Sequence, residues 1–331
     1  MDKSTNNSDI TILSVGDAHR RVPEVIRNDN DRMLLKKVSD IVVSDSSIIG
    51  DNADYHNLAA TYAKLDDYLS AFNIVIKGLR QFPYDVDLLA DAVKYGSKCG
   101  QIEESKKYLS TLLSRPFVYW NWRTFTFVID FYLLSITWEN PGTIEKTLQE
   151  ALKIAREYQK LTPAEERGFV AEAEIYLASS DVDGAISVLK KAIYDCEGIL
   201  APQCCIKYAD ILAERGDFKQ VIEVCRKGLI FTAQDQPTAR TGYFCYLSAL
   251  AKDALIHRDA AFSDERRVMD AYIDYKTAYK LLKVTPRYIE NIIDRTEILS
   301  AKSGIPFEIE GNMDGEKLEK LVELLSANSK T

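Results

Sequence analysis

The sequence predicts an all-α fold in which antiparallel helix pairs stack into an α-solenoid, and three observations support this prediction. From residue 53 onward, apolar residues recur at helical spacing in segments of about a dozen residues or more, separated by short polar breaks. The breaks recur at intervals of about 35 residues, which is typical of stacked repeats. Proline and glycine are sparse, at 9 and 15 of 331 residues, which favours long helices joined by short turns.

Four of the breaks share one pattern, a short turn followed by a helix that opens with a small or apolar residue. They are DDYLSAFNIVIKGL (66–79), GQIEESKKYLSTLL (100–113), SDVDGAISVLKKAI (180–193) and RGDFKQVIEVCRKGL (215–229). Ala71 and Ser105 open the first two helices 34 residues apart, and Ala185 and Val221 open the last two 36 residues apart. A repeat of this period predicts units that each bury one apolar face against their neighbours.

Helix starts carry recognisable sequence signals. Asn140-Pro141, Ala201-Pro202 and Thr285-Pro286 place proline in the first turn of a predicted helix, where its missing N–H costs nothing. The segment Thr162-Pro163-Ala164-Glu165 has the order of a capping box, so a helix is expected to begin there. These signals predict paired helices with tight turns.

The packing residues of the first predicted pair resemble those of the tetratricopeptide repeat (TPR) family. They are Tyr55, Leu58, Ala59 and Tyr62 on the first helix, Ala71, Val75 and Gly78 on the second, and a closing Pro83. Ala59, Ala71 and Gly78 fall where two helices cross closely, and only small side chains allow that approach. The resemblance covers about residues 53–300 and implies a right-handed, TPR-like superhelix. The units at 119–160 and 238–284 depart from the pattern through longer helices and connections.

The sequence divides into four segments. Residues 1–30 are expected to form a mobile N-terminal tail, and residues 31–52 a leading helix and linker. Residues 53–302 are expected to form the repeat array, with about six helix pairs and a capping helix. Residues 303–331 are expected to form a loop and an amphipathic helix, which docks on the end of the array or on a partner.

Composition narrows the classes of function. The formal net charge of −8 disfavours nucleic-acid binding and gives no general attraction to anionic lipid. Six cysteines make no CxxC pair, and several fall inside apolar helical patterns, which predicts free thiols in a reducing compartment. No signal peptide and no apolar run of membrane-spanning length is present. The expected location is the cytoplasm.

Catalytic and metal-binding motifs are scarce in this sequence. It contains no glycine-rich phosphate loop, nucleophile elbow or HExxH, and His19, His56 and His257 lie far apart. The stretch from Glu310 to Gly315 resembles the start of a calcium loop, but Leu321 occupies the position of the last carboxylate ligand. We therefore expect no enzyme, no cofactor and no metal.

The resemblance implies that a partner binds on the concave face, which the first helices of the pairs form. In the family's carboxylate clamp, Lys, Asn and Arg on this face hold a terminal carboxylate. The matching positions here are His56, Ala60, Ala90 and Lys94, and only Lys94 would suit a clamp. The later positions are Val170, Glu174, Ile206 and Asp210. Their mixed apolar and acidic character predicts a groove for an apolar or basic segment.

Aromatic residues concentrate in one segment, residues 117–132. Trp and Tyr are frequent anchors of protein interfaces, so Tyr119, Trp120 and Trp122 are candidate partner contacts. The alternative is that most of these rings fill the core of an irregular unit. Base stacking is disfavoured, because Arg123 is the single basic residue of the stretch.

These observations predict a non-catalytic scaffold or adaptor that binds another protein or a peptide segment. The predicted partner-binding residues are His56, Lys94, Tyr119, Trp120, Trp122, Glu174 and Asp210. A peptide-sensing regulator that changes shape on binding, and an RNA-associated helical-repeat protein, are the alternatives.

Overall fold

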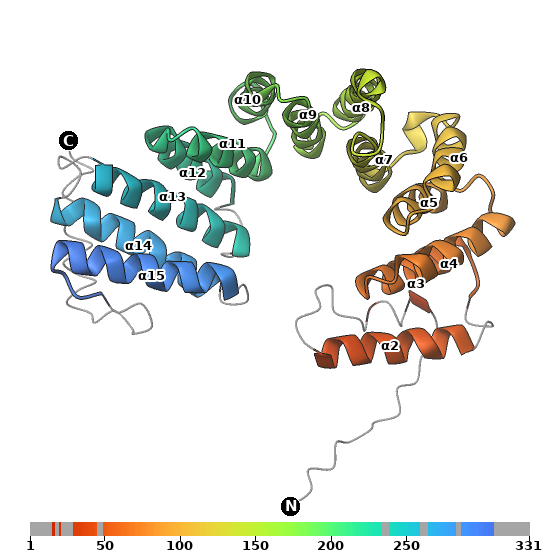
Figure 1. Cartoon of the computed structure of the whole chain (residues 1–331), viewed down its shortest axis with the longest axis horizontal. Helices are drawn as coiled ribbons and strands as arrows, with labels where there is room; N and C mark the ends of the chain where they lie inside the picture. Colours follow the sequence, from red (N-terminus) through yellow and green to blue (C-terminus); the bar gives the residue numbers. More distant parts are fainter. Residues whose placement is uncertain are drawn as a thin grey trace, which may run out of the picture. The chain divides into compact units, whose positions relative to one another are not determined.

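The computed structural model of the protein describes residues 15–16, 20, 29–44, 49–232, 238–258, 264–282 and 286–307. Within these residues every regular element is a helix (Figure 1). The chain divides into two units, residues 1–161 (unit 1) and residues 162–331 (unit 2). Both are built from helix pairs that pack on their sequence neighbours, so the predicted all-α solenoid is confirmed.

Among the residues of unit 1 that the structure describes from residue 29 onward, three helix pairs follow a single helix. The elements are α2 (Asp29–Ser44), α3 (Asn52–Lys64), α4 (Tyr68–Gln81), α5 (Val86–Lys98), α6 (Ile102–Leu113), the 3₁₀ turn η2 (Phe117–Tyr119), α7 (Trp122–Ser135) and α8 (Pro141–Leu161). The pairs are α3/α4, α5/α6 and α7/α8, and the first helix of each pair also contacts the first helix of the next.

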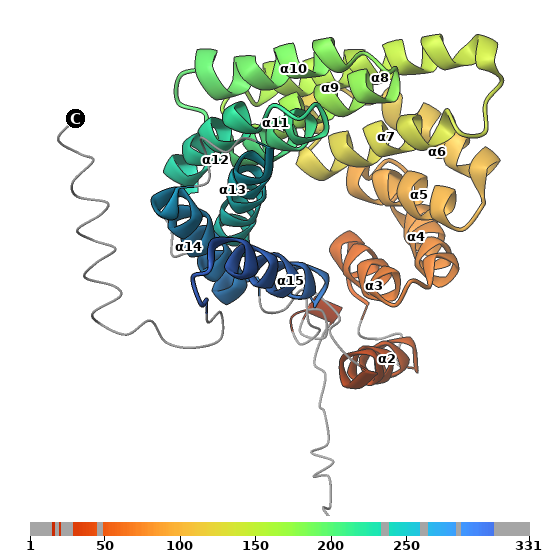
Figure 2. The ribbon, with the colours of Figure 1, turned by 60° about the vertical axis from the view of Figure 1, so that its left-hand side comes forward.

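The described residues of unit 2, which end at residue 307, likewise form three pairs, and one further helix follows them (Figure 2). The elements are α9 (Arg167–Ala178), α10 (Val182–Lys190) with its π-helical extension η3 (Lys191–Asp195), α11 (Pro202–Glu214), α12 (Phe218–Thr232), α13 (Ala239–Arg258), α14 (Glu265–Leu281) and α15 (Pro286–Ser303). The pairs are α9/α10, α11/α12 and α13/α14, and α15 packs on α14.

The helix starts predicted from proline agree with the structure, and the start predicted at residues 162–165 does not. Pro141, Pro202 and Pro286 each occupy the first helical position, as predicted. The helix predicted to begin at residues 162–165 begins later. These residues form a turn in which Glu165 N–H donates to Thr162 O at 3.0 Å, and α9 begins only at Arg167.

Four of the pairs share the same turn between their two helices. Asp66, Gly100, Ser180 and Gly216 each have a positive φ, between 61° and 82°, just after the first helix. The next residue often caps the second helix. The Asp67 side chain accepts a hydrogen bond from the Ser70 N–H, and the Asp181 side chain accepts one from the Gly184 N–H. The periodic breaks in the sequence are therefore one turn repeated.

Small residues allow the helices to approach where the sequence predicted. Ala59 and Ala71 are fully buried. A β-carbon added to Gly78 would lie only 2.9 Å from the Tyr55 side chain of the first helix. The close crossing predicted for the first pair is confirmed.

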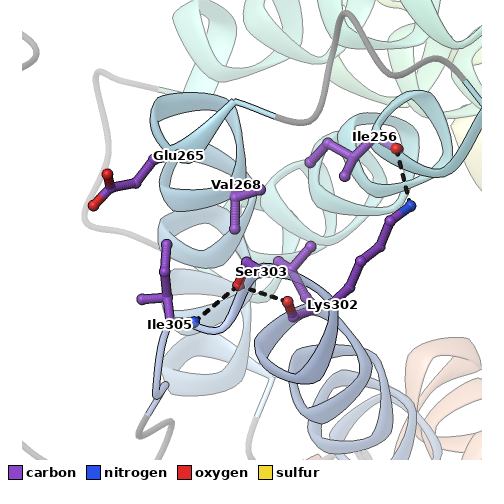
Figure 3. A pocket seen from close by; sticks show the side chains of 7 residues that line it. Ile256, Glu265, Val268, Lys302, Ser303 and Ile305 are labelled. Carbon is purple, nitrogen blue, oxygen red and sulfur yellow. Dashed lines mark hydrogen bonds between the residues drawn. The ribbon is translucent and has the colours of Figure 1, made fainter.

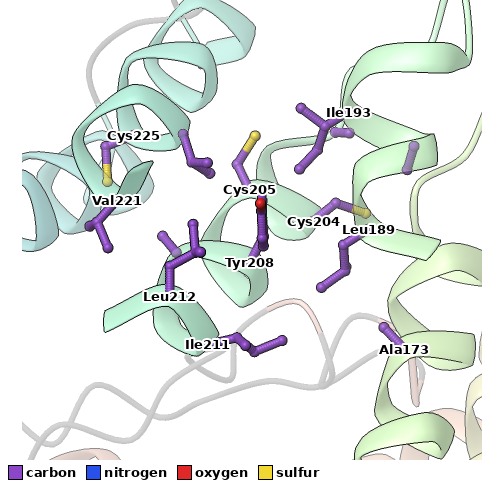
Figure 4. Close-up of a cluster of buried hydrophobic side chains, with 14 of the residues drawn as sticks. Ala173, Leu189, Ile193, Cys204, Cys205, Tyr208, Ile211, Leu212, Val221 and Cys225 are labelled. Carbon is purple, nitrogen blue, oxygen red and sulfur yellow. The ribbon is translucent and has the colours of Figure 1, made fainter. Parts of the chain in front are cut away.

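The core of unit 2 joins α9 to α13 through one continuous cluster of buried side chains (Figure 4). Cys204, Cys205 and Cys225 belong to it and serve as small apolar groups. All six cysteines are free thiols. Burial raises the pKa of Cys205 to about 12, so this thiol stays protonated and unreactive near neutral pH.

Gly228 gives a test of this packing. A β-carbon at Gly228 of α12 would overlap the ring of Phe244, which is fully buried on α13. Gly228→Ala is therefore expected to lower the free energy of unfolding by about 1–3 kcal/mol, although alanine favours the helix. Urea unfolding followed by circular dichroism measures this. Gly142→Ala is the control, since its β-carbon would meet nothing within 4 Å, and it should leave stability unchanged or slightly higher.

Candidate partner-binding faces

Successive first helices are joined by side-chain hydrogen bonds between residues about one repeat apart. In unit 1, Asn52 Nδ2 donates to Asp85 Oδ2 at 2.7 Å, and Asn121 Nδ2 donates to Asp87 Oδ1 at 2.6 Å. The partners are 33 and 34 residues apart in sequence. These bonds connect α3 to α5 and α7 to α5, so the first helices form one continuous surface, here called the first-helix face of unit 1.

A buried carboxylate lies at the centre of this face. Asp91 on α5 is 1% exposed, and its Oδ2 bonds to Nδ1 of His56 on α3. The Arg123 guanidinium on α7 bonds to His56 Nε2 and lies 3.7 Å from Asp91 Oδ1. Burial raises the pKa of Asp91, and the neighbouring His56 and Arg123 oppose that rise. Three first helices thus meet at one charged cluster.

The cluster also fixes the tautomer of His56. A guanidinium can only donate, so His56 Nε2 must accept from Arg123. Nδ1 then carries the proton and donates to Asp91. Both ring nitrogens are used within the chain, so His56 shapes the face but has no ring nitrogen left for a partner.

Lys94 lies beside this cluster on α5. Its ammonium is 3.8 Å from the centroid of the Phe127 ring on α7, and Arg123 is 5.4 Å from the same ring. Burial lowers the pKa of Lys94. The structure therefore brings the predicted residues His56 and Lys94 together around Asp91, and adds Arg123 and Phe127, which the sequence analysis had not assigned to the face.

The aromatic segment divides into core and surface residues. Trp120 is 6% exposed and packs against Phe117 and Phe125, with ring centroids 4.8 and 5.1 Å away. Phe125 in turn stacks on Tyr158 of α8 at 4.6 Å. The assignment of Trp120 as a partner contact is therefore wrong, because the ring is enclosed by its own unit.

Tyr119 and Trp122 remain on the surface, at 65% and 45% exposure. Tyr84 and Val118 are also exposed, and the Asn121–Asp87 bond draws the starts of α5 and α7 together. We call these four residues the edge patch of unit 1. Trp, Tyr and aliphatic side chains presented in this way are typical of protein-binding surfaces.

The first-helix face of unit 2 has a different character. Glu174 on α9 accepts from Lys207 on α11 at 2.7 Å, and Asp210 on α11 accepts from the Tyr243 hydroxyl on α13 at 3.2 Å. Both pairs are again separated by about one repeat. Burial raises the pKa of Asp210, with the Tyr243 hydrogen bond acting against it. Each predicted acidic residue thus already has one partner in the neighbouring helix.

Farther along unit 2, a second buried carboxylate holds the last helices together. Asp253 on α13 is fully buried and accepts from Arg295 Nε of α15 at 2.7 Å and from the Tyr275 hydroxyl of α14 at 3.1 Å. His257 Nδ1 lies 2.8 Å from Asp253 Oδ1, but the hydrogen bond goes to the Asp253 carbonyl oxygen at 2.9 Å. Asp253 therefore connects three helices, as Asp91 does in unit 1.

A pocket of about 390 Å³ lies among the same three helices (Figure 3). Its lining combines Val268 and Leu299 with Glu265 and Lys302. The Lys302 ammonium donates to the carbonyl oxygen of Ile256 at 3.1 Å. This bond ties α15 to α13, so the pocket is part of the packing of the last helix.

The described part of the chain shows neither a metal site nor a membrane span. Its His, Cys, Asp and Glu side chains form no group of three that could hold a metal ion. Its helices fall short of the length and apolarity that a bilayer span requires. The calcium-loop resemblance at residues 310–315 and the amphipathic segment at 316–327 lie outside the described residues.

Together, the helix pairs, the repeated turn and the small residues at the crossings define a TPR-like fold. No protein-family model matches the chain, and no curated protein matches it. Among solved structures, a thermophilic TPR protein of Thermus thermophilus is similar at 17% identity and a TM-score of 0.44, over 62% of this chain and 99% of that chain.

Two further solved structures cover more of this chain. A tetratricopeptide repeat protein from Parabacteroides merdae is similar at 14% identity and a TM-score of 0.45, over 81% of this chain and 91% of that chain. Human IFIT1, solved as a dimer with m7Gppp-AAAA, is similar at 13% identity and a TM-score of 0.41, over 95% of this chain and 69% of that chain. Similarities at this level concern the fold alone.

Proposed function

We propose that the chain is a non-catalytic scaffold that binds a partner polypeptide through the first-helix faces and the edge patch. The edge patch is the observation that carries the proposal. Tyr119 and Trp122 stay exposed although neighbouring rings of the same segment are buried in the core. Covering such rings with a partner would remove a large apolar area from water.

The first-helix faces support the same function. Their side chains are held by hydrogen bonds to the next first helix, so a partner would meet a surface that is already ordered. Lys94 and Arg123 give unit 1 basic groups, while Glu174 and Asp210 give unit 2 acidic groups. On each unit by itself, a segment with an apolar part and charged residues of the opposite sign would suit the face.

The test selects 12-residue peptides from a random phage-displayed library on the immobilised full chain. Fluorescence anisotropy then measures the affinity of labelled synthetic versions. The double variant Tyr119→Ala, Trp122→Ala is expected to bind them about tenfold more weakly or worse, because truncating interface anchors costs about 1–4 kcal/mol.

Tyr194→Ala is the matched control. Tyr194 is an exposed tyrosine on η3, which extends a second helix, and its loss should leave the affinities unchanged. Selection of no binding peptide would refute the proposal, as would equal affinity of the double variant. Small-angle scattering with and without peptide tests the alternative of a regulator that changes shape. Fluorescence anisotropy with a labelled RNA oligonucleotide tests the RNA-associated alternative.

A further inference from the structure

Three tyrosine rings gather in unit 2 where its first-helix face meets α15. Tyr243 and Tyr246 are on α13, and Tyr288 is on α15. The Tyr288 centroid is 5.7 Å from that of Tyr243 and 5.2 Å from that of Tyr246. All three residues are half-buried, so each keeps some contact with solvent. The negative face of an aromatic ring attracts cations, most strongly where water is partly excluded.

A carboxylate stands beside these rings. Asp210 Oδ1 accepts from the Tyr243 hydroxyl at 3.2 Å, and Asp210 accepts no other hydrogen bond in the described part of the chain. Burial raises the pKa of Asp210, while the Tyr243 hydrogen bond and the positive charge of Lys207 oppose that rise and the negative charge of Glu214 adds to it. Burial therefore makes the ionised form of Asp210 costly, and a bound cation would reduce that cost.

The balance of charge near Asp210 is also negative. Glu174, Asp210 and Glu214 supply three carboxylates on α9 and α11, against the ammonium of Lys207. Lys207 is already paired with Glu174 at 2.7 Å. A cation from outside the chain would therefore complement this face, whereas an acidic segment would be repelled.

We infer that Asp210, Tyr243, Tyr246 and Tyr288, here called the Tyr–Asp site, bind an arginine side chain of the partner polypeptide. A guanidinium is planar, so it can lie on a tyrosine ring while its N–H groups pair with a carboxylate. The ammonium of lysine is compact and not planar, so it would stack less well on a tyrosine ring. The inference rests on the proposed function, because it presupposes that a polypeptide binds.

Two phage libraries of 12-residue peptides test the site, one with arginine and one with glutamate fixed at the centre. Both are selected on the full chain carrying Tyr119→Ala and Trp122→Ala, so that the edge patch does not contribute. The arginine library is expected to supply the binders. In a selected peptide, replacing that arginine by citrulline, which is isosteric but uncharged, should weaken binding about tenfold.

A double-mutant cycle then assigns the arginine to Asp210. Asp210→Asn should weaken the arginine peptide about tenfold and leave the citrulline peptide within about twofold. Asp183→Asn removes the same charge from an exposed position on α10 and should change neither affinity, which separates a local contact from general attraction. Thermal unfolding confirms that both variants fold.

The outcomes separate the two proposals. If citrulline and Asp210→Asn each weaken peptide binding and their effects on the free energy of binding simply add, the arginine does not contact Asp210. That result would overturn the Tyr–Asp site and leave the proposed function standing. Enrichment from the glutamate library would also overturn the site. A third outcome is that neither the arginine nor the glutamate library supplies a binder, although the random library supplies binders on the unaltered chain. That outcome also refutes the Tyr–Asp site, and the scaffold function survives it.

Discussion

Trp120→Ala is expected to lower the free energy of unfolding of unit 1 by about 3–5 kcal/mol, the range for removing a large buried aromatic side chain. The ring fills the space between η2 and α7, where it contacts Phe117 and Phe125. Phe125 carries the packing on to Tyr158 of α8. The variant should therefore loosen the α7/α8 pair. Hydrogen exchange measured by mass spectrometry would show lost protection over residues 117–161.

Trp122→Ala is the matched control, two residues away in the sequence. Its ring is 45% exposed, so less apolar area is lost and the change should stay below about 1 kcal/mol. Similar losses of stability for the two variants would contradict the division into core and edge patch. The contrast also explains why Trp120→Ala cannot test partner binding, since weaker capture would follow from loosened packing.

The fold was predictable because the same physical requirement recurs along the chain. Each pair needs small residues at its crossing and a turn of fixed geometry, so Ala59, Ala71 and Gly78 could be assigned to the crossing through their resemblance to the TPR pattern. The repeated left-handed turn residue shows in the sequence as a periodic break. Local signals were less reliable. The segment at residues 162–165 satisfies the capping-box pattern, yet it forms a turn before α9.

The site was less predictable because it depends on contacts between units of the repeat. Trp120 and Trp122 have the same chemistry, and only the short turn η2 and the start of α7 at Trp122 place one inside and one outside. Periodicity does not specify such a turn. The bond between His56 and Asp91 depends on a partner 35 residues away in the sequence, in the next unit of the repeat.

A signal for these bonds was nevertheless present. Asn52–Asp85, Asn121–Asp87 and Asp210–Tyr243 are complementary pairs separated by 33 or 34 residues. Complementary hydrogen-bonding residues one repeat apart in the sequence therefore predict bonds of this kind. The Tyr246–Asn291 pair is 45 residues apart, because α13 and α14 are long, so a one-repeat spacing points to Asp210 and Tyr243 of the Tyr–Asp site but not to α15.

Asp253→Ala is expected to lower the free energy of unfolding of unit 2 by about 3 kcal/mol or more. Removing one partner of a buried ion pair leaves the other without compensation, and the buried Tyr275 hydroxyl would lose its acceptor as well. Arg295 is 31% exposed, so water would solvate part of the freed charge and keep the loss near the lower end of the range for buried pairs. Urea unfolding and hydrogen exchange over residues 286–303 measure the effect.

Asp183→Ala tests whether this loss comes from burial. Asp183 also pairs with an arginine, Arg215, at 2.8 Å, but its side chain is 87% exposed. An exposed pair contributes about 0–1 kcal/mol, because water solvates both charges well when the pair is broken. If Asp253→Ala cost no more than Asp183→Ala, α15 would be held by its apolar contacts, and Asp253 would have no role in attaching it to α13. A larger loss, with exchange rising first in α15, is expected because Asp253 is the acceptor shared by α14 and α15.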